Sequence, residues 1–243
     1  MTEYDESRAT YALLRRPDPR IAERIERALG HARSVLNVGA GAGSYEPRDR
    51  EVTAVEPSAT MRAQRPPDAP PAIDARAEEL PFGEASFDAA MAILTMHHWD
   101  DWAAGLRELR RVARDRVVIL TYDVSQAGTL WFVRDYLPEL AAVDSDRMPP
   151  IEALGGSVET VPIPHDCTDG FLGAYWRRPE RYLDRAAHVG ISTLAEVEPA
   201  ALERALSTLR ADLDSGEWQR RYADLLEREE LDLGYRMVVV RHT

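Results

Sequence analysis

Three glycines at alternate positions, Gly39, Gly41 and Gly43, form the motif of this chain that bears most directly on chemistry. They follow the apolar run Ser34 to Val38, as a tight loop follows a buried strand. Because glycine has no Cβ, the backbone of such a loop can pass close to a ligand, and the helix start behind it presents free N–H groups. The motif therefore predicts a loop that binds a ligand through its backbone.

A carboxylate ends the next apolar run, where Val52 to Val55 is followed by Glu56. In that position a carboxylate can accept hydrogen bonds from both hydroxyls of a ribose. Dinucleotide sites carry the spacing GxGxxG, whereas the spacing here is GxGxG, which is typical of sites for S-adenosylmethionine. In the alternative interpretation, the glycines only make a tight turn and the Glu56 carboxylate is solvated.

Three ordered segments resemble the motifs of the class I S-adenosylmethionine-dependent methyltransferases. Residues 35–43 are similar to motif I of that family and residues 52–58 to its second motif. Residues 77–82, followed by 86–88, resemble the AExLPF and SFD segments of the branch that includes the ubiquinone and menaquinone methyltransferases. The resemblance covers about residues 18–122. It implies a doubly wound α/β fold and transfer of a methyl group from S-adenosylmethionine to an acceptor.

The resemblance also implies which residues bind the cofactor, although two positions depart from the family pattern. Asn37 stands where the family usually has an acidic residue, and we expect it to hold the loop by hydrogen bonds. Arg76 stands where many members have an aspartate that binds the adenine amine, so we assign the adenine to Ala77 and Glu78. The cofactor-binding set is Tyr11, Arg15, Gly39, Ala40, Gly41, Gly43, Glu56, Pro57, Met61, Ala77, Glu78, Leu94 and Thr95.

Two members of this set lie near the N-terminus. Related methyltransferases often have a tyrosine-containing segment that closes over the cofactor, which implies that role for Tyr11. Arg15 is assigned to the methionine carboxylate, which a guanidinium can bind through two hydrogen bonds. The alternative is an ordinary helix face on which the Arg15 charge is solvated.

Two histidines, His97 and His98, follow the apolar run Phe87 to Leu94, at the sheet edge where open α/β sheets bind ligands. Methyl transfer needs an aligned acceptor, and a base if the acceptor begins protonated. One histidine then serves as that base or orients the acceptor; alternatively, both are packing and capping residues. No second cluster accompanies them at a metal-binding spacing, so we predict no metal site.

The acceptor is predicted to be a small molecule rather than a nucleic acid. The sequence of residues 95–98, Thr-Met-His-His, is neither the (D/N/S)PP(Y/F) box of amino-directed DNA methyltransferases nor the Pro-Cys of the cytosine C5 enzymes. The 30 basic and 42 acidic residues give a net charge of -12, which repels phosphate backbones. All basic residues are arginine, and without lysine a Schiff base, a pyridoxal phosphate anchor or a Walker-type loop is excluded.

The sequence favours a protein of a reducing compartment. Its single cysteine, Cys167, excludes an internal disulfide and a cysteine-rich zinc cluster. The N-terminal residues carry acids and no apolar core, and no run approaches the roughly 20 apolar residues of a membrane span. We therefore expect a cytoplasmic protein without a membrane partner.

A second polar cluster is a candidate for the acceptor site. It contains His165, Asp166 and Asp169, which either line the acceptor pocket, with His165 catalytic, or turn the chain at the Asp169-Gly170 pair. Five aromatic residues offer walls for an acceptor or belong to the core. They are Trp131, Phe132, Tyr136, Tyr175 and Trp176.

The elements that position these residues alternate between short apolar strands and helices. Strands are expected at residues 34–38, 52–55, 87–94, 117–121, 158–163 and 234–241, and helices at 18–29, 102–113, 150–154, 199–213 and 218–228. Ser58 is expected to cap a further short helix. This alternation predicts a doubly wound, Rossmann-like, mostly parallel sheet of seven strands with a helical insertion before the last strand.

The chain is long enough for one large domain. We expect a single methyltransferase domain over residues 1–243, composed of four parts. These are N-terminal helices at 1–30, a cofactor-binding core at 31–163, an inserted helical lid for the substrate at 164–232 and a final strand at 233–243.

Two other functions remain open from the sequence. An enzyme of this fold can use the sulfonium of bound S-adenosylmethionine only as a positive charge, and catalyse a cyclisation or rearrangement without methyl transfer. A noncatalytic binding protein that has lost its acceptor site is the other alternative, and the intact loop together with Glu56 argues against it.

Overall fold

The computed structural model describes residues 14–145 and 147–242. These residues divide into two compact units. The sheet unit comprises residues 19–123, 147–161 and 235–242, and the helical unit comprises residues 14–18, 124–145 and 162–234. Within this described part of the chain, none of the helices has the length and apolar character needed to cross a membrane.

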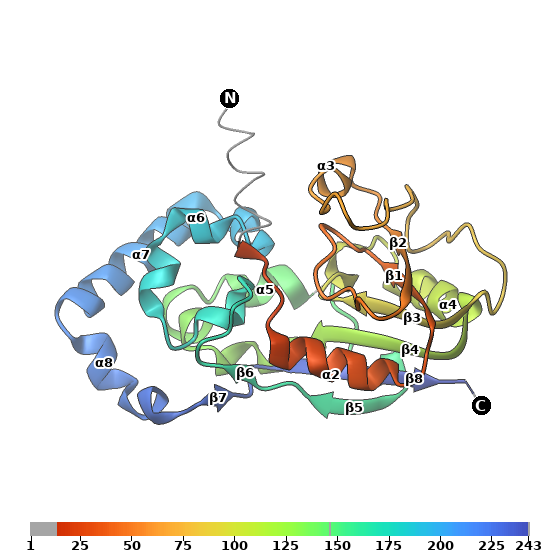
Figure 1. The fold of residues 1–243 in the computed structure, drawn as a ribbon. Helices are drawn as coiled ribbons and strands as arrows, with labels where there is room; N and C mark the ends of the chain where they lie inside the picture. Colours follow the sequence, from red (N-terminus) through yellow and green to blue (C-terminus); the bar gives the residue numbers. More distant parts are fainter. Residues whose placement is uncertain (1–13, 146, 243) are drawn as a thin grey trace. The chain divides into compact units, whose positions relative to one another are not determined.

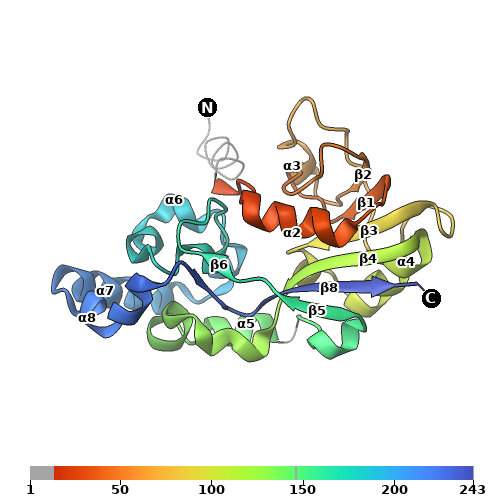
Figure 2. The same ribbon diagram turned by 60° about the horizontal axis from the view of Figure 1, so that its bottom comes forward.

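The sheet unit contains a six-stranded sheet in the order β2-β1-β3-β4-β8-β5 (Figure 1). The first four strands in this order are parallel, and β8 is antiparallel to both of its neighbours, β4 and β5 (Figure 2). The strands are β1 (Ser34–Val38), β2 (Glu51–Val55), β3 (Phe87–Ile93), β4 (Ala113–Tyr122), β5 (Ser157–Thr160) and β8 (Tyr235–Arg241). This is the mostly parallel, Rossmann-like α/β sheet that the sequence predicts.

The sheet has six strands rather than the predicted seven. Next to the edge strand β2, Ile73 is the only described residue that forms a parallel bridge, and its partner is Val55. Pro70 and Pro71 precede it, and proline has no N–H to donate to a ladder. The extra strand is therefore reduced to a single bridge.

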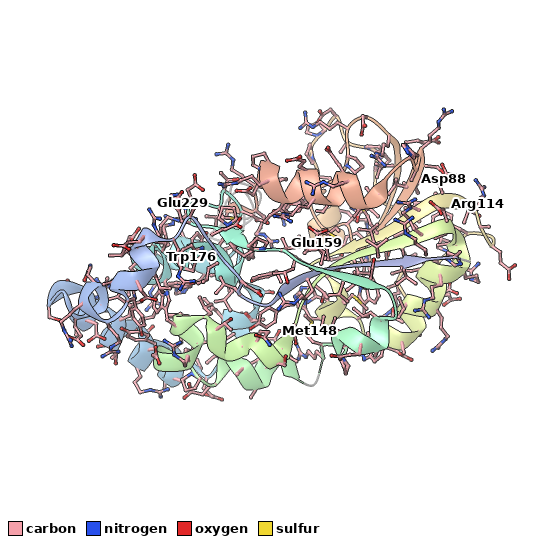
Figure 3. All side chains as sticks on the ribbon, turned by 90° about the horizontal axis from the view of Figure 1, so that it is seen from below. Asp88, Arg114, Met148, Glu159, Trp176 and Glu229 are labelled. Carbon is pink, nitrogen blue, oxygen red and sulfur yellow. The ribbon has the colours of Figure 1, made fainter. Side chains whose placement is uncertain are left out.

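Helices cover both faces of this sheet, α2 on one face and α4 on the other (Figures 1 and 3). In α4, Asp101 caps the start by accepting from the N–H of Ala104 at 2.9 Å, and Leu106, Leu109 and Val112 form the buried stripe. The helices and helical turns of the sheet unit are α2 (Pro19–Leu29), α3 (Ala59–Arg62), η1 (Met96–His98), α4 (Trp102–Val112) and η4 (Ile151–Leu154).

The core on the α4 side consists of apolar side chains from the strands and from α4. Leu36 and Val38 of β1 pack there with Val117 and Ile119 of β4. Burying such side chains stabilises the fold by about 1.5–3 kcal/mol each. This packed layer fixes the positions at which β1, β2 and β3 end.

The helical unit is built mainly from short helical turns. Its two strands, β6 (Ile163–Pro164) and β7 (Glu230–Leu231), form a small antiparallel sheet. The helical turns are η2 (Val124–Thr129), η3 (Phe132–Tyr136), α5 (Leu140–Ser145), η5 (Leu172–Tyr175), η6 (Pro179–Leu183), α6 (Arg185–His188), η7 (Ser192–Glu196), α7 (Pro199–Asp214), α8 (Glu217–Arg221) and η8 (Ala223–Glu227).

An aromatic cluster is the core of the helical unit. Trp131 lies at the centre, with ring centroids 5.2 Å from Trp218 and 5.4 Å from Tyr182, and Phe132 stacks on Tyr182 at 4.2 Å. Trp176 is fully buried; its indole N–H donates to the carbonyl of Ile163 at 3.0 Å, and its own carbonyl accepts from Trp131 (Figure 3). The five aromatic residues singled out from the sequence are all buried.

The observed boundaries differ from the predicted ones at three places. The expected strand at 158–163 is two strands, because β5 pairs with β8 whereas β6 pairs with β7. Residues 124–145, expected in the core, belong to the helical unit, where Trp131 and Phe132 pack on the aromatic cluster. The expected helix at 218–228 is interrupted at Tyr222, between α8 and η8.

Candidate functional site

The glycine loop and Glu56 lie together because β1 and β2 are parallel neighbours. Val38 and Val55 are paired at the ends of these strands, so the loop and Glu56 leave the same edge. Glu56 is only 7% exposed; its Oε2 accepts from the N–H of Gly41 at 2.9 Å and its Oε1 from that of Ser58 at 2.8 Å. The predicted solvated alternative for Glu56 is therefore wrong.

The three glycines are needed for different reasons, although all have positive φ angles of 67°, 53° and 91°. A Cβ on Gly39 would lie 2.1 Å from Thr95 Oγ1, and one on Gly43 would lie 3.2 Å from an Arg65 nitrogen. A Cβ on Gly41 would meet only the end of the Met61 side chain, at 3.4 Å. At Gly41 the backbone is thus open to a ligand rather than closed by the protein.

This geometry fits S-adenosylmethionine. A buried carboxylate at the end of β2 suits the ribose hydroxyls, and the open backbone at Gly41 permits the close approach that a bound nucleoside needs. Ala40 holds the turn by donating its N–H to the carbonyl of Val55 at 3.0 Å. The loop is a turn in both interpretations, and the positive φ of Gly41 suits both; what distinguishes Gly41 is that a Cβ there would meet only the end of a flexible side chain.

The end of β3 lies at the same edge of the sheet as the ends of β1 and β2. Leu94 has a φ of 51°, a left-handed conformation that is costly for a residue with a branched side chain and that gathers at functional sites. Its N–H donates to the carbonyl of Leu120 at 2.8 Å, which holds it in place. The next residue, Thr95, is buried directly beside Gly39.

The segment assigned to adenine is fixed by acidic side chains. Ala77 is buried, and Glu78 Oε1 accepts from the N–H groups of Asp100 and Asp101 at 2.9 and 3.2 Å. Arg76 donates to the Asp100 carboxylate and lies 3.7 Å from that of Glu78. Glu78 therefore anchors the chain that follows η1, beside the backbone of Ala77.

Met61 and Pro57 follow Glu56 along the chain, around the start of α3. Ser58 caps this helix as predicted, accepting from the N–H of Met61 at 3.3 Å. Pro57 is exposed and Met61 is half-buried, with its methyl group facing Gly41. The cofactor candidates of the sheet unit thus surround the strand ends.

His97 and His98 lie in η1, immediately after Thr95. Their rings are 3.9 Å apart with an angle of 47° between their planes. His97 is half-buried and His98 is exposed, so the two rings have different surroundings although they touch. Both the catalytic and the packing interpretations remain predictions. Among the described residues, no cluster of three metal-ligating side chains is present.

The remaining candidates belong to the helical unit. His165 is tied to Glu229, with its Nε2 3.2 Å from the carboxylate and its N–H donating to the Glu229 carbonyl at 2.9 Å. Arg15 donates from Nε to the buried carboxylate of Asp169 at 2.7 Å, so its charge is paired rather than solvated. Tyr11 lies outside the described residues.

The Asp169-Gly170 pair forms the predicted turn. Asp169 Oδ1 accepts from the N–H of Gly170 at 2.7 Å while it also binds Arg15. Burial raises the pKa of the neighbouring Cys167 thiol to about 12, so the thiol stays protonated at neutral pH. The buried, protonated thiol disfavours a nucleophilic role for Cys167.

Two residues beside the loop, Glu46 and Arg65, escaped the sequence interpretation. Asn37 donates from Nδ2 to Glu46 Oε1 at 3.0 Å, and Arg65 binds both oxygens of Glu46. The departure at Asn37 was the available signal, since it suggests that a carboxylate from elsewhere occupies this region. Arg65 is far from Asn37 and Glu46 in the sequence, so no local pattern identifies it as their partner.

Comparison with known proteins identifies the family. Residues 36–121 match the profile of a family described as a methyltransferase domain. A protein of Anabaena variabilis, assigned as a methyltransferase of an antibiotic biosynthesis pathway, is 33% identical; the alignment covers 94% of this chain and 99% of that one, with a TM-score of 0.85.

Two more distant matches cover less of the chain. An S-adenosylmethionine-dependent methyltransferase of Thermotoga maritima is 20% identical over 65% of this chain and 81% of its own, with a TM-score of 0.48. The Escherichia coli protein YafE is 36% identical over 52 residues, which span 21% of this chain and a quarter (25%) of YafE. The likeness to the Anabaena protein extends over nearly the whole of both chains, and the sheet edge fits the cofactor. The chain belongs to the class I S-adenosylmethionine-dependent methyltransferases.

Proposed function

We propose that this enzyme transfers the methyl group of S-adenosylmethionine to a small-molecule acceptor, a bacterial metabolite. The observation that carries the proposal is the full-length similarity to the Anabaena protein, which is assigned to an antibiotic biosynthesis pathway. The likeness includes the helical unit as well as the sheet unit, because the alignment covers 94% of this chain.

Charge supports a small acceptor over a nucleic acid. The chain carries a net charge of -12, which disfavours approach to a phosphate backbone. The residues after β3 also lack the boxes of the DNA methyltransferases. A narrower resemblance to the ubiquinone and menaquinone branch rests on the motifs alone and remains a prediction.

Residues of the sheet unit are proposed to hold the cofactor. Glu56 accepts from the ribose hydroxyls, the backbone at Gly41 faces the ligand, and Ala77 and Glu78 border the adenine. Thr95 holds the loop in position through its contact with Gly39. Tyr11 and Arg15 complete the proposed cofactor set from the N-terminal side.

The bound cofactor supplies an electrophilic methyl group. The protein's own work is then to align the acceptor, exclude water and, for an acceptor that begins protonated, remove a proton. We assign the removal of this proton to His97, which is half-buried after the end of β3, with the ring of His98 tilted against it. His165 is a second candidate, held by Glu229.

The helical unit is proposed to supply the acceptor site. An open sheet edge alone leaves the reacting atoms in water, and a cover of some kind keeps the acceptor aligned. The segment from His165 to Glu230 is mainly helical and carries its own polar groups, among them the buried carboxylate of Asp169.

Labelled cofactor tests the proposal. The purified protein and methyl-labelled S-adenosylmethionine are incubated in separate reactions with a fractionated metabolite extract, with bulk RNA, with DNA and with a protein lysate. We expect label in a small-molecule fraction and none in the macromolecules. Label found only in nucleic acid or protein would refute the small-molecule assignment.

The same experiment addresses the alternative of a cyclisation or rearrangement without methyl transfer. Such an enzyme would bind the cofactor and change a metabolite while releasing neither label nor S-adenosylhomocysteine. Mass spectrometry of the extract before and after incubation separates the two reactions, since methylation adds the mass of one CH₂ and a rearrangement adds none.

A further inference from the structure

A network of three side chains lies behind the glycine loop. Asn37, at the fourth position of β1, is 2% exposed and donates from Nδ2 to Glu46 Oε1 at 3.0 Å. Glu46 follows the loop in sequence, so this contact joins the residue before the loop to the residue behind it. The loop is thereby closed by two side chains in addition to its backbone turn.

Arg65 completes the network with a two-pronged ion pair. Its Nη1 donates to Glu46 Oε1 at 2.9 Å and its Nη2 to Oε2 at 2.8 Å, with the Arg65 and Glu46 side chains only 4% and 11% exposed. Parallel N–H bonds of this kind fix the relative orientation of guanidinium and carboxylate. Removing one partner of such a buried pair leaves an uncompensated charge.

The same guanidinium reaches the proline-rich segment. Arg65 donates from Nε and Nη2 to the carbonyl of Pro70 at 3.1 and 3.0 Å. A single side chain thus connects the glycine loop to the chain that leads to the Ile73 bridge beside β2. The pair therefore joins two loops at the strand-end edge.

The loop packs closely against the Glu46–Arg65 ion pair at Gly43. A Cβ there would lie 3.2 Å from Arg65 Nη1 and 3.4 Å from Glu46 Oε2. A Cβ on Gly41, by contrast, would meet only Met61 Cε, at 3.4 Å. One glycine accommodates the ion pair on the protein side, and the other leaves the ligand side open.

The neutral side chain at position 37 also follows from this arrangement. An amide N–H can donate to Glu46, whereas a carboxylate in its place would put two acceptors about 3 Å apart with one guanidinium to serve both. Asn37 and Glu46 are therefore complementary, with one donor and one acceptor.

We propose that Glu46 and Arg65 are positioning residues of the cofactor site, which hold the glycine loop in its binding shape, and that Asn37 is the neutral partner that Glu46 requires. The inference rests on the proposed assignment of the loop to the cofactor. It adds two residues that contact the loop from behind and that no glycine motif contains.

Calorimetric binding of S-adenosylhomocysteine, with thermal unfolding of each ligand-free variant, tests the proposal. Glu46→Gln and Asn37→Asp should each raise the Kd by about tenfold or more, which corresponds to about 1.4 kcal/mol. Asp74→Asn is the matched control, because it removes the exposed Arg62 pair from the same segment. Its Kd should stay within about twofold of the wild type.

The double variant Asn37→Asp/Glu46→Gln separates positioning from simple loss of stability. It returns one carboxylate and one amide to the network with donor and acceptor exchanged, but glutamine at position 46 offers Arg65 one acceptor oxygen instead of two. Its Kd should therefore recover part of the loss seen in the worse single variant. Arg65→Lys keeps the charge but loses the two-pronged geometry, and a rise of several-fold is expected.

Either of two results would overturn the proposal. One is a Glu46→Gln or Arg65→Lys protein that binds with wild-type Kd, even with a lowered unfolding temperature. The other is a double variant no better than the worse single one. A wild-type protein that fails to bind S-adenosylhomocysteine would instead refute the assignment of the loop to the cofactor.

Discussion

Glu56 accepts a hydrogen bond from the backbone N–H of Gly41 at 2.9 Å, from across the gap between the ends of β2 and β1. Its second oxygen accepts from the N–H of Ser58. A carboxylate has about four lone-pair directions, so two remain for the hydroxyls of a ribose. Glu56, which is proposed to bind the ribose, therefore also holds the glycine loop in position through its hydrogen bond to Gly41.

Glu56→Ala should weaken binding of S-adenosylhomocysteine by about 1.5–3 kcal/mol, because it removes charge-assisted hydrogen bonds from the ligand. Isothermal calorimetry measures the change. Glu51→Gln, an exposed acid at the start of the same strand, should bind as the wild type does. Unchanged affinity in Glu56→Ala would sink the ribose assignment, and NAD should not bind to either protein.

Gly41→Val and Gly39→Ala should have opposite signatures. Valine at Gly41 also carries the strain of a positive φ, about 1–2 kcal/mol, but it meets only the end of the Met61 side chain, so the protein should still fold with a lowered melting temperature while cofactor binding is lost. A Cβ at Gly39 meets Thr95 Oγ1 at 2.1 Å, and overpacking plus the positive φ should cost about 2–5 kcal/mol of stability. Circular dichroism melts and calorimetry compare the two. Collapse of Gly41→Val would show that this glycine is structural first.

His97→Ala should lower turnover by about 10²-fold while the Kd for S-adenosylhomocysteine stays within about twofold, since a general base acts on the acceptor. His165→Ala should lower turnover less. His98→Ala is the exposed control from the same turn. Equal turnover in the His97 and His98 variants would contradict the assignment of the proton to His97.

Asp88 should make the stability of the sheet unit depend on pH. Its carboxylate accepts from the N–H groups of Ser34 and Arg33 at 3.1 and 2.9 Å and pairs with Arg114 at 2.8 Å (Figure 3). The backbone hydrogen bonds of Ser34 and Arg33 lower the pKa of this carboxyl, against the opposing effect of burial.

Because the pKa is lower in the folded state, unfolding takes up a proton, and the stabilisation is present above the ordinary aspartate range near pH 4. It is lost as the pH falls through the lowered folded value. Asp88→Asn should therefore be less stable than the wild type by about 1 kcal/mol at pH 7, with the difference vanishing as the pH falls below the lowered folded pKa of Asp88. Urea unfolding at several pH values checks this, with Asp68→Asn as an exposed control. A pH-independent difference would contradict the assignment.

The elements predicted correctly from the sequence are those whose signals are local. An apolar run that meets glycines defines β1, and an apolar stripe with a period of 3.6 residues defines α4. Both patterns follow from contacts within a few residues along the chain. The edge at which Gly41, Glu56 and Thr95 meet follows from the parallel order of these strands.

The elements that were missed depend on partners far away in sequence. The apolar run at 158–163 looks continuous, yet Ser157 pairs with Val239 and Ile163 pairs with Leu231. The turn at 132–136 is held by ring contacts such as Phe132 on Tyr182 rather than by its own propensity. No window of adjacent residues contains this information.

The ion pair behind the loop was missed for the same reason. Glu46 and Arg65 have no motif spacing, and each resembles an ordinary surface charge in the sequence. Only folding buries them against Asn37. The asparagine at position 37, where the family usually has an acidic residue, is explained by the Glu46 carboxylate that accepts its hydrogen bond.

The place of β8 in the sheet has a consequence for how the chain folds as it is synthesised. This strand begins at Tyr235 and lies between β4, which ends at Tyr122, and β5 (Figure 2). While the ribosome makes the long intervening stretch, β4 has an open edge and β5 has no partner. Pairings of such long sequence separation are slow to form, and exposed edges invite association with other chains. A nascent chain arrested before residue 235 is thus expected to be the species most in need of a chaperone.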